Sequence, residues 1–145
     1  SHEVELSKSK VYSIIEDKSG NIWLGLSEKG IFQQPPVASG FRYMGYKAGA
    51  SNLIGTSNIC CVFTDSRNNT WLGADKDGIY CLDDHGNLVG HYYEGVPSTV
   101  LTICEDESGH IWIGSYGEGG GWIDPRTSMY HPINNDSYGC FSLTD

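Results

Sequence analysis

Basic residues are scarce in this chain. Only 9 Lys and Arg stand against 18 Asp and Glu in 145 residues, which gives a formal net charge of −9 at pH 7. A surface of this charge repels phosphate groups and offers little counterion release. Nucleic acids and anionic membrane surfaces are therefore not expected as partners.

Long hydrophobic runs are also missing. No apolar stretch approaches the roughly 20 residues that a membrane helix needs, and the first residues do not form a charged and then apolar leader. We expect no direct membrane contact in this segment. Either the protein is cytosolic, or a signal peptide lies outside this sequence.

Paired cysteine motifs are lacking as well. The number of cysteines is odd, and none belongs to a C-x-x-C pair or has a His at a spacing typical of zinc sites. Four of the five lie in predicted strands, where free Cys packs as a small hydrophobe. We therefore expect packing roles, no metal and no cofactor, with a disulfide as the less favoured alternative. The cysteines are Cys60, Cys61, Cys81, Cys104 and Cys140.

Glycine and aromatic residues are plentiful, with 19 Gly, 9 Tyr and 4 Trp, and this composition favours strands joined by tight turns. Asp, Trp and Gly recur at fixed offsets in three places. The three Trp residues are 48 and 41 residues apart, a spacing typical of four-stranded propeller blades. The recurring residues are Asp17, Trp23 and Gly25; Asp65, Trp71 and Gly73; and Asp106, Trp112 and Gly114.

Each repeat unit contains four short segments that predict antiparallel strands. The first strand of each unit is apolar and is expected to be buried; these strands cover 11–15, 59–63 and 100–104. The sequence predicts an all-β fold, a β-propeller fragment of about three four-stranded antiparallel blades plus the first strand of a fourth. The blade units cover approximately 9–46, 58–93 and 99–133, and the further blade starts at 138–145.

Two turn positions recur in every unit and carry residues that enter positive φ cheaply. They are Gly20, Asn68 and Gly109 between the first two strands, and Gly30, Gly78 and Gly119 between the next two. The longest connection, 47–57, joins an outer strand to the next inner strand. In a propeller, such connections share a face with the turns between second and third strands. We expect a ligand to bind on that face.

The segments Glu16 to Gly25 and Glu105 to Gly114 resemble the two-component regulator propeller repeat, whose pattern is an apolar strand followed by Glu-Asp-x-Ser-Gly-x-Ile-Trp-Ile/Leu-Gly. The middle unit departs from it at Thr64 and Asn68. The resemblance implies the periplasmic sensor region of a hybrid two-component histidine kinase, anchored in the inner membrane of a Gram-negative bacterium. It also implies that many relatives sense glycan fragments. The kinase domains are not part of this sequence, so the segment itself is not expected to be an enzyme.

The repeated residues have structural explanations. A Trp that recurs once per blade is expected to pack between neighbouring sheets. A calcium or general-acid role is conceivable for the repeated Asp, but its place at the start of a tight turn favours hydrogen bonding to the backbone two residues on. The histidines share no common offset, so they predict neither a metal ring nor a repeated site.

Ligand sites usually break a repeat rather than follow it. Tyr116 and Trp122 flank the glycine-rich turn 117–121 on the expected ligand face and have no aromatic counterpart in the other units. We therefore predict that these two residues contact an oligosaccharide.

The sequence supports one preferred function and leaves two alternatives open. The preferred one is glycan sensing in signal transduction; the alternatives are an enzymatic propeller, of glycoside hydrolase or lactone lyase type, and a protein-interaction scaffold. Three blades cannot close a ring, since propellers use about four to eight. Open sheet edges promote association, so we expect a homo-oligomer.

Overall fold

The computed structural model describes residues 6–36, 42–44, 54 and 58–133, and within them the chain folds into three four-stranded antiparallel sheets. A short 3-10 turn, Leu6–Lys8, precedes them. Sheet 1 contains β1 (Val11–Glu16), β2 (Ile22–Leu26), β3 (Gly30–Gln34) and β4 (Arg42–Met44). Sheet 2 contains β5 (Ile59–Thr64), β6 (Thr70–Ala74), β7 (Ile79–Leu82) and β8 (Leu88–Tyr92). Sheet 3 contains β9 (Val100–Glu105), β10 (Ile111–Ser115), β11 (Gly120–Asp124) and β12 (Met129–Pro132).

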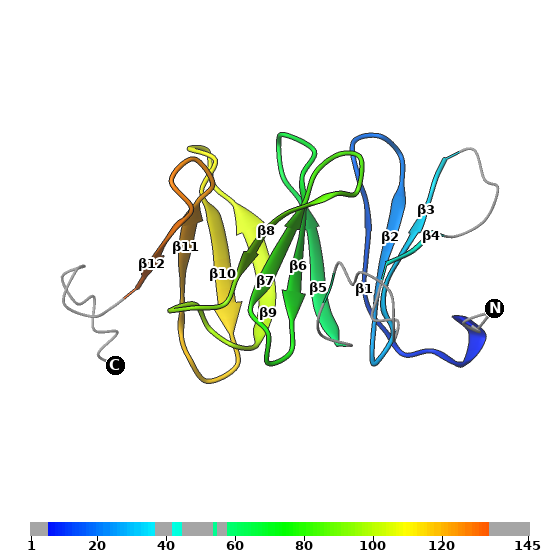
Figure 1. Ribbon diagram of the computed structural model, residues 1–145, viewed down its shortest axis with the longest axis horizontal. Coiled ribbons are helices and arrows are strands. Elements are labelled where there is room, and N and C mark those ends of the chain that lie inside the picture. The colour runs from blue at the N-terminus through cyan, green and yellow to red at the C-terminus, as the bar shows by residue number, and fades with distance from the viewer. Residues whose placement is uncertain (1–5, 37–41, 45–53, 55–57, 134–145) are drawn as a thin grey trace, which may run out of the picture.

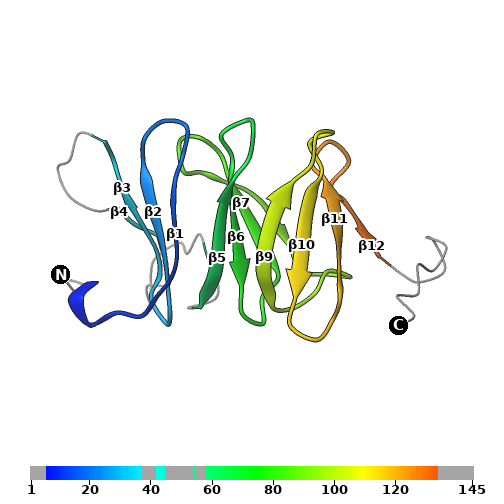
Figure 2. The ribbon, with the colours of Figure 1, turned by 180° about the vertical axis from the view of Figure 1, so that it is seen from behind.

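The sheets stand side by side in chain order, with sheet 1 and sheet 3 at opposite ends of the molecule (Figure 1). Within each sheet the strands follow one another in sequence order. The first strands, β1, β5 and β9, contact one another from sheet to sheet and form a row when the molecule is seen from behind (Figure 2). This is the arrangement of successive propeller blades, so the predicted fold class is confirmed. The predicted start of a fourth blade, 138–145, lies outside the described residues.

A hydrophobic core fills the space between sheets 1 and 2. Trp23 and Ile31 of sheet 1, both almost fully buried, pack with Val62, Leu72 and Tyr80 of sheet 2. Val62 of β5 is paired with Leu72 of β6, and Leu72 is paired with Tyr80 of β7, so the three side chains lie on the face of sheet 2 that packs on sheet 1. The alternation of strand side chains thus selects which residues meet the neighbouring sheet.

The second core repeats this arrangement between sheets 2 and 3. Trp71 and Ile79 pack against Ile103, Ile111 and Ile113. Trp71 is as buried as Trp23, at 1% exposure each, whereas Trp112 is only partly buried because no described sheet covers the far face of sheet 3. The recurring indole therefore lies between sheets wherever a following sheet is described.

The expectation that the first strand of every unit is buried is wrong for β1 and only partly right for β9, where Leu101 is 45% exposed. Ile14 of β1 is 63% exposed, because no described sheet precedes sheet 1 to cover that face. The corresponding Val62 in β5 is buried against sheet 1. Burial of a first strand thus depends on a neighbour on both sides.

Backbone conformation at the two recurring turn positions confirms the prediction of positive φ. The angle is 64° at Asn68 and 72–82° at the five glycines. Lack of space, rather than backbone conformation, explains the glycine two residues after Trp71. A Cβ on Gly73 would meet the Cys61 sulfur and would lie 2.7 Å from the Val100 carbonyl oxygen of sheet 3. Sheets 2 and 3 can approach this closely only without a side chain there.

Polar contacts also join adjacent sheets at the turns between first and second strands. The backbone N–H and the hydroxyl of Ser66 both donate to the Glu105 carboxylate of the next sheet, each at 2.6 Å. At the preceding junction the equivalent of Glu105 is Thr64, and Asn68 makes the link instead. Its side chain accepts from the Lys18 backbone N–H at 3.1 Å and donates to the Ser19 hydroxyl at 2.8 Å.

Burial between sheets predicts the cost of truncation. Ile111→Ala should lower the free energy of unfolding by about 2–5 kcal/mol, because Ile111 is fully buried between sheets 2 and 3. Val89→Ala truncates an aliphatic side chain of β8 that is 59% exposed and should change stability by less than about 0.5 kcal/mol. Urea unfolding followed by tryptophan fluorescence measures both. Equal losses in the two variants would contradict this assignment of the core.

Candidate functional site

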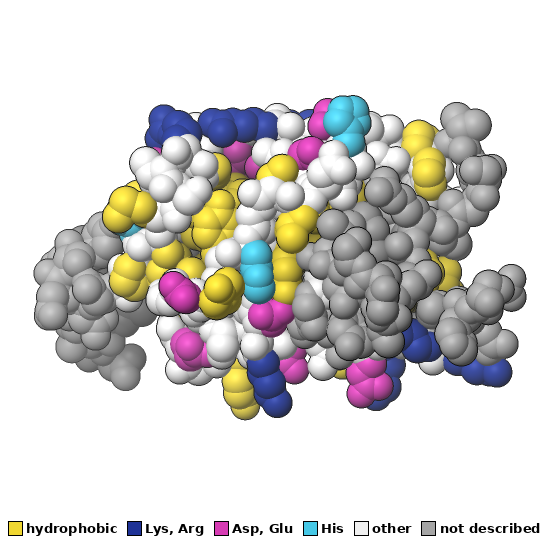
Figure 3. All heavy atoms as spheres, in the orientation of Figure 1, with side chains coloured by type: hydrophobic (Ala, Val, Ile, Leu, Met, Phe, Trp, Pro, Cys, Tyr) yellow, Lys and Arg dark blue, Asp and Glu magenta, His cyan; other side chains and the backbone are white. Residues whose placement is uncertain are grey.

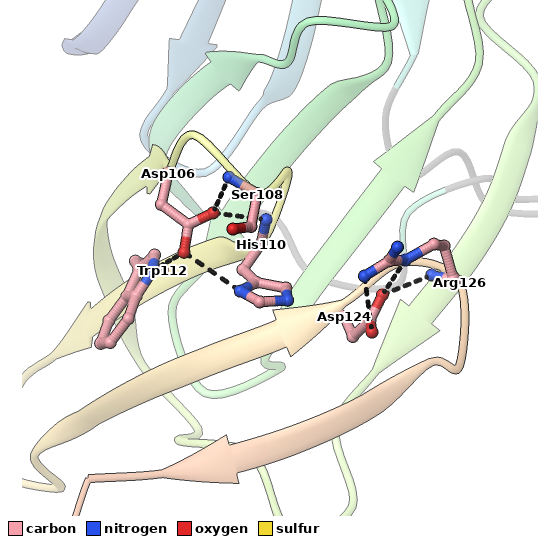
Figure 4. A network of polar contacts seen from close by, with 6 residues as sticks. All are labelled: Asp106, Ser108, His110, Trp112, Asp124 and Arg126. Atoms are coloured by element: carbon pink, nitrogen blue, oxygen red, sulfur yellow. Dashed lines mark hydrogen bonds and ion pairs between the residues drawn. The ribbon is translucent and has the colours of Figure 1, made fainter.

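The repeated Asp of each unit is held in a closed set of hydrogen bonds. In sheet 3 one carboxylate oxygen of Asp106 accepts from the backbone N–H groups of Ser108 and His110, at 2.8 and 3.0 Å. The other accepts from the Trp112 indole N–H at 2.8 Å and lies 3.1 Å from His110 Nδ1 (Figure 4). The carboxylate thus closes the turn and orients the indole.

The same geometry recurs in the other sheets. Asp17 and Asp65 each accept from two backbone N–H groups of their turns and from the indole N–H of Trp23 and Trp71, at 2.8 and 2.9 Å. Within the described ranges, no group of His, Cys, Asp and Glu side chains is placed to hold a metal ion. These contacts explain the recurring Asp as a turn and packing residue.

Hydrogen bonding lowers the pKa of two of these carboxyl groups, Asp106 and Asp17. The indole of Trp112, followed by the backbone N–H groups of the turn, lowers the pKa of Asp106 from 3.8 to about 2. For Asp17, burial acts to raise the pKa, but the hydrogen bonds from Trp23, Asn21 and Ser19 together outweigh it and the pKa is lowered. A general acid at neutral pH needs the opposite shift, so neither group is suited to that role.

The lowered pKa of Asp106 predicts a pH-dependent stability. A carboxyl whose folded pKa is depressed stabilises the fold above its usual pKa of 3.8, and this contribution disappears as the pH falls toward about 2. Asp106→Asn should therefore be less stable than the original chain at pH 7, and the difference should shrink between pH 4 and pH 2. Urea unfolding at a series of pH values measures this difference. The control is Asp84→Asn, at an exposed carboxylate, and a difference for Asp106→Asn that is constant with pH would contradict the prediction.

A groove of about 560 Å³ opens where the three sheets meet near their first strands. It is called the axial groove below. All three sheets contribute to it, through β1, the start of β5 and the start of β9, together with the turns β6–β7 and β10–β11. Its lining residues are Tyr12, Asn58, Cys60, Asp75, Lys76, Thr99, Leu101 and Tyr116.

The floor of the axial groove is a polar network that crosses two sheet boundaries. Asn58 accepts from the Glu28 backbone N–H at 2.7 Å and donates to Asp75 at 3.4 Å. The Thr99 hydroxyl donates to the other oxygen of Asp75 at 3.0 Å and accepts from the Lys76 backbone N–H at 3.1 Å. These bonds fix the turns on which the groove depends.

The walls of the groove are apolar and accessible. Tyr12, Leu101 and Tyr116 are 55%, 45% and 77% exposed. A pocket with aromatic and aliphatic walls and a few fixed polar groups is typical of small-molecule sites. The groove lies at the turns between second and third strands, the face on which the sequence predicts ligand binding. Of the predicted long connection 47–57, the structure describes only Ile54, which is buried in the core between sheets 1 and 2.

The two residues predicted to contact ligand do not line one pocket. Tyr116 belongs to the axial groove, whereas Trp122 is not among its lining residues. Trp122 is paired with Trp112 across the sheet, and its ring lies between those of His110 and His131, with centroids 4.2 and 4.0 Å away. The position of Trp122 corresponds to Cys81 in sheet 2, which is buried against sheet 3.

Sequence reasoning missed Tyr12 and Leu101, because both lie in strands that were expected to be buried. Alternation could not have indicated them, because each is the unpaired residue of an irregular pairing, Tyr12 between Val11 and Ser13 and Leu101 between Val100 and Thr102. Sequence reasoning also missed the grouping of His110 and His131 around Trp122. Strand pairing brings His131 beside Trp122, and His110 reaches it from the turn that precedes β10.

The described cysteines are all free. Burial raises the pKa of Cys61 and of Cys81 to about 12 in each case. Since the thiolate is the reactive form, these two side chains serve in packing rather than chemistry, in line with the prediction. Cys60 lines the axial groove, and there burial and then the charge of Asp75 raise its thiol pKa as well.

Comparison with known proteins agrees with the fold. Among solved structures, the extracellular domain of the putative hybrid two component system BT3049 from B. thetaiotaomicron is similar over 94% of this chain, with a TM-score of 0.74 and 17% identity. A catalytically inactive virginiamycin B lyase from Staphylococcus aureus is similar over 88%, with a TM-score of 0.69 and 16% identity. The chain covers 20% of the first structure and 42% of the second. At these identities the likeness establishes a propeller fold.

Comparison of the sequence with protein-family models identifies two of the repeats. Residues 5–28 and 95–117 match the model of the family described as two component regulator propeller. The chain therefore carries two-component regulator propeller repeats at these residues, as the sequence predicted, and its propeller fold is similar to that of the extracellular domain of a putative hybrid two component system. No curated protein is significantly similar in sequence. None of the described residues forms a helix long and apolar enough to cross a membrane.

Proposed function

We propose that the chain is a ligand-sensing segment of a hybrid two-component sensor histidine kinase, located in the periplasm, and that it binds an oligosaccharide in the axial groove. The single observation that carries this proposal is the groove itself, with two exposed tyrosines above a fixed polar floor. The regulator propeller repeats support the kinase context.

The chemistry of the groove suits a sugar. Tyr12 and Tyr116 offer aromatic faces for the apolar side of a pyranose ring, and their hydroxyls can donate and accept hydrogen bonds. Lys76 adds a flexible donor at the rim. Most of a sugar's affinity would then come from ring contact, with the polar groups fixing its orientation.

Sensing requires that binding favours one arrangement of domains over another. A ligand in the axial groove would contact side chains from three sheets at once, so it would favour the arrangement in which those sheets hold the groove closed around it. In the parent kinase this preference would be passed to the domains that follow.

The groove proposal is tested by a calorimetric screen of neutral and acidic oligosaccharides against the full sensor region. Tyr116→Ala should weaken the binding of any hit by about fivefold or more, because truncating an interface aromatic commonly costs more than about 1 kcal/mol. Tyr93→Ala is the matched control, since Tyr93 is similarly exposed but does not line the groove. Consistent failure to bind any glycan would contradict the proposal.

An enzymatic propeller remains the alternative, because a virginiamycin B lyase is among the structural neighbours. The same screen separates the two functions. Turnover of a glycan or of a cyclic lactone by the intact parent, abolished by replacing a single His or Glu, would favour the enzyme.

We also propose that the chain associates with a second copy through its end sheets. Ile14 of β1 occupies the position of Val62, which packs on the preceding sheet, and Trp122 occupies the position of Cys81, which packs on the following one. The exposed face of sheet 1 and the exposed face of sheet 3 thus correspond to the two halves of an observed interface. A head-to-tail contact would cover both.

Light scattering over a range of concentrations tests this association. Ile14→Asp should raise the dissociation constant by about tenfold or more, because an unpaired carboxylate is costly to bury. Leu88→Asp, at an exposed position of β8 in the middle sheet, should leave it unchanged. A folded monomer of the original chain at high concentration would count against the proposal.

A further inference from the structure

A second pocket lies at the outer edge of the molecule, away from the residues of the axial groove. It has a volume of about 280 Å³ and lies between β8 with the turn that follows it and the end of the β11–β12 turn. It is called the outer pocket below. The residues that matter for its chemistry are His91, Tyr92, Tyr93, Glu94, Ser128 and Tyr130.

The walls of the outer pocket are aromatic and are held in place by stacking. Tyr92 stacks on the buried Trp71, with ring centroids 5.8 Å apart, and its hydroxyl lies 3.4 Å from that of Ser128. The Tyr93 ring is tilted against His91 at 4.8 Å and remains 57% exposed. His91 is itself stacked on Tyr80 at 3.9 Å. An exposed ring on a fixed support is ready to receive a ligand without rearrangement.

The charge around this pocket is negative. Glu94 is exposed at its rim, and no Lys or Arg is among the described residues that line it. Burial, and then the negative charge of Glu118, raise the pKa of Tyr130. In Figure 3, hydrophobic, acidic and histidine side chains gather over β7 and β8, whereas Lys and Arg lie toward the margins of the molecule.

Tyr93, the exposed aromatic residue of the outer pocket, is not part of the packing between sheets. Tyr92 and Tyr130 pack against the core between sheets 2 and 3, so these two walls of the pocket also have a structural role. Tyr93 follows the end of β8, is 57% exposed and does not belong to that core. The packing of the sheets therefore does not require an aromatic ring at this position, in contrast to the indoles that recur in every sheet.

We propose that the outer pocket binds a small organic cation, one that carries an alkylated ammonium group. Tyrosine faces attract such a group through the ring quadrupole, and a nearby carboxylate adds a charge of the right sign. Tyr93 supplies the accessible ring, Tyr92 and Tyr130 form the walls, and Glu94 supplies the charge. A neutral ligand would gain nothing from the charge of Glu94.

Choline is the probe for this site. The matched ligand control is its neutral isostere 3,3-dimethyl-1-butanol, in which carbon replaces the charged nitrogen. An NMR titration of the full chain should show shifts in sheet 2 around β8 with choline and much weaker ones with the isostere. Binding of choline should also weaken as salt is added, because the charge of Glu94 is exposed to solvent. Absence of choline binding, or equal binding of the isostere, would overturn the proposal.

Four variants test the location of the site. Tyr93→Leu should weaken choline binding by about 3- to 30-fold, whereas Tyr93→Phe keeps the ring and should bind as well as the original chain. Glu94→Gln should weaken binding by about 2- to 5-fold and reduce its salt dependence. Tyr116→Leu, in the axial groove, should have no effect on choline. Undiminished binding in both Tyr93→Leu and Glu94→Gln would exclude this pocket, and the outcome is independent of any glycan in the axial groove.

Discussion

The hydrogen bond between a turn carboxylate and an indole links each turn of this structure to the packing between sheets. Asp106 and Trp112 illustrate it: the carboxylate closes the tight turn between two strands and also fixes the plane of the ring. At Trp23 and Trp71 the same bond orients rings that fill the space between sheets. Local turn geometry and packing between sheets are thus determined by one contact, repeated once per sheet, and neither could change without the other.

This constraint leaves two regions free to vary. Residues at the centre of each sheet are fixed by the indole, by the neighbouring core and by close backbone approach, as at Gly73. Side chains that face the axial groove, and exposed side chains at the ends of the outermost strands, carry no such constraint. Both pockets lie in these regions, the axial groove near Tyr12 and Tyr116 and the outer pocket near Tyr93. A repeat protein can therefore acquire binding sites without altering the residues that stack its units.

Much of the fold could be predicted from the sequence, because Trp spacing and turn glycines report on contacts within one unit. The site was harder to predict, since it depends on which units are neighbours. The sequence predicts Trp122 as a ligand contact; strand pairing places it opposite Trp112, at the position that in sheet 2 packs against the next sheet. The sequence shows Thr64 and Asn68 as departures from the repeat but gives no reason for them. The structure shows that Asn68 makes the link between sheets that Glu105 makes at the next junction.

A ligand in the axial groove could change how the sheets are oriented relative to one another, because the groove is lined by all three sheets. Its floor already joins the sheets through Asn58, Asp75 and Thr99, and these bonds are exposed or half-buried, so each contributes modestly. The hydrophobic cores hold the sheets together but have little direction, since apolar contact depends on area more than on angle. A ligand that bridged Tyr12 and Tyr116 would therefore act where directional bonds are few. It would therefore change the angle between the sheets while adding little to their total stability.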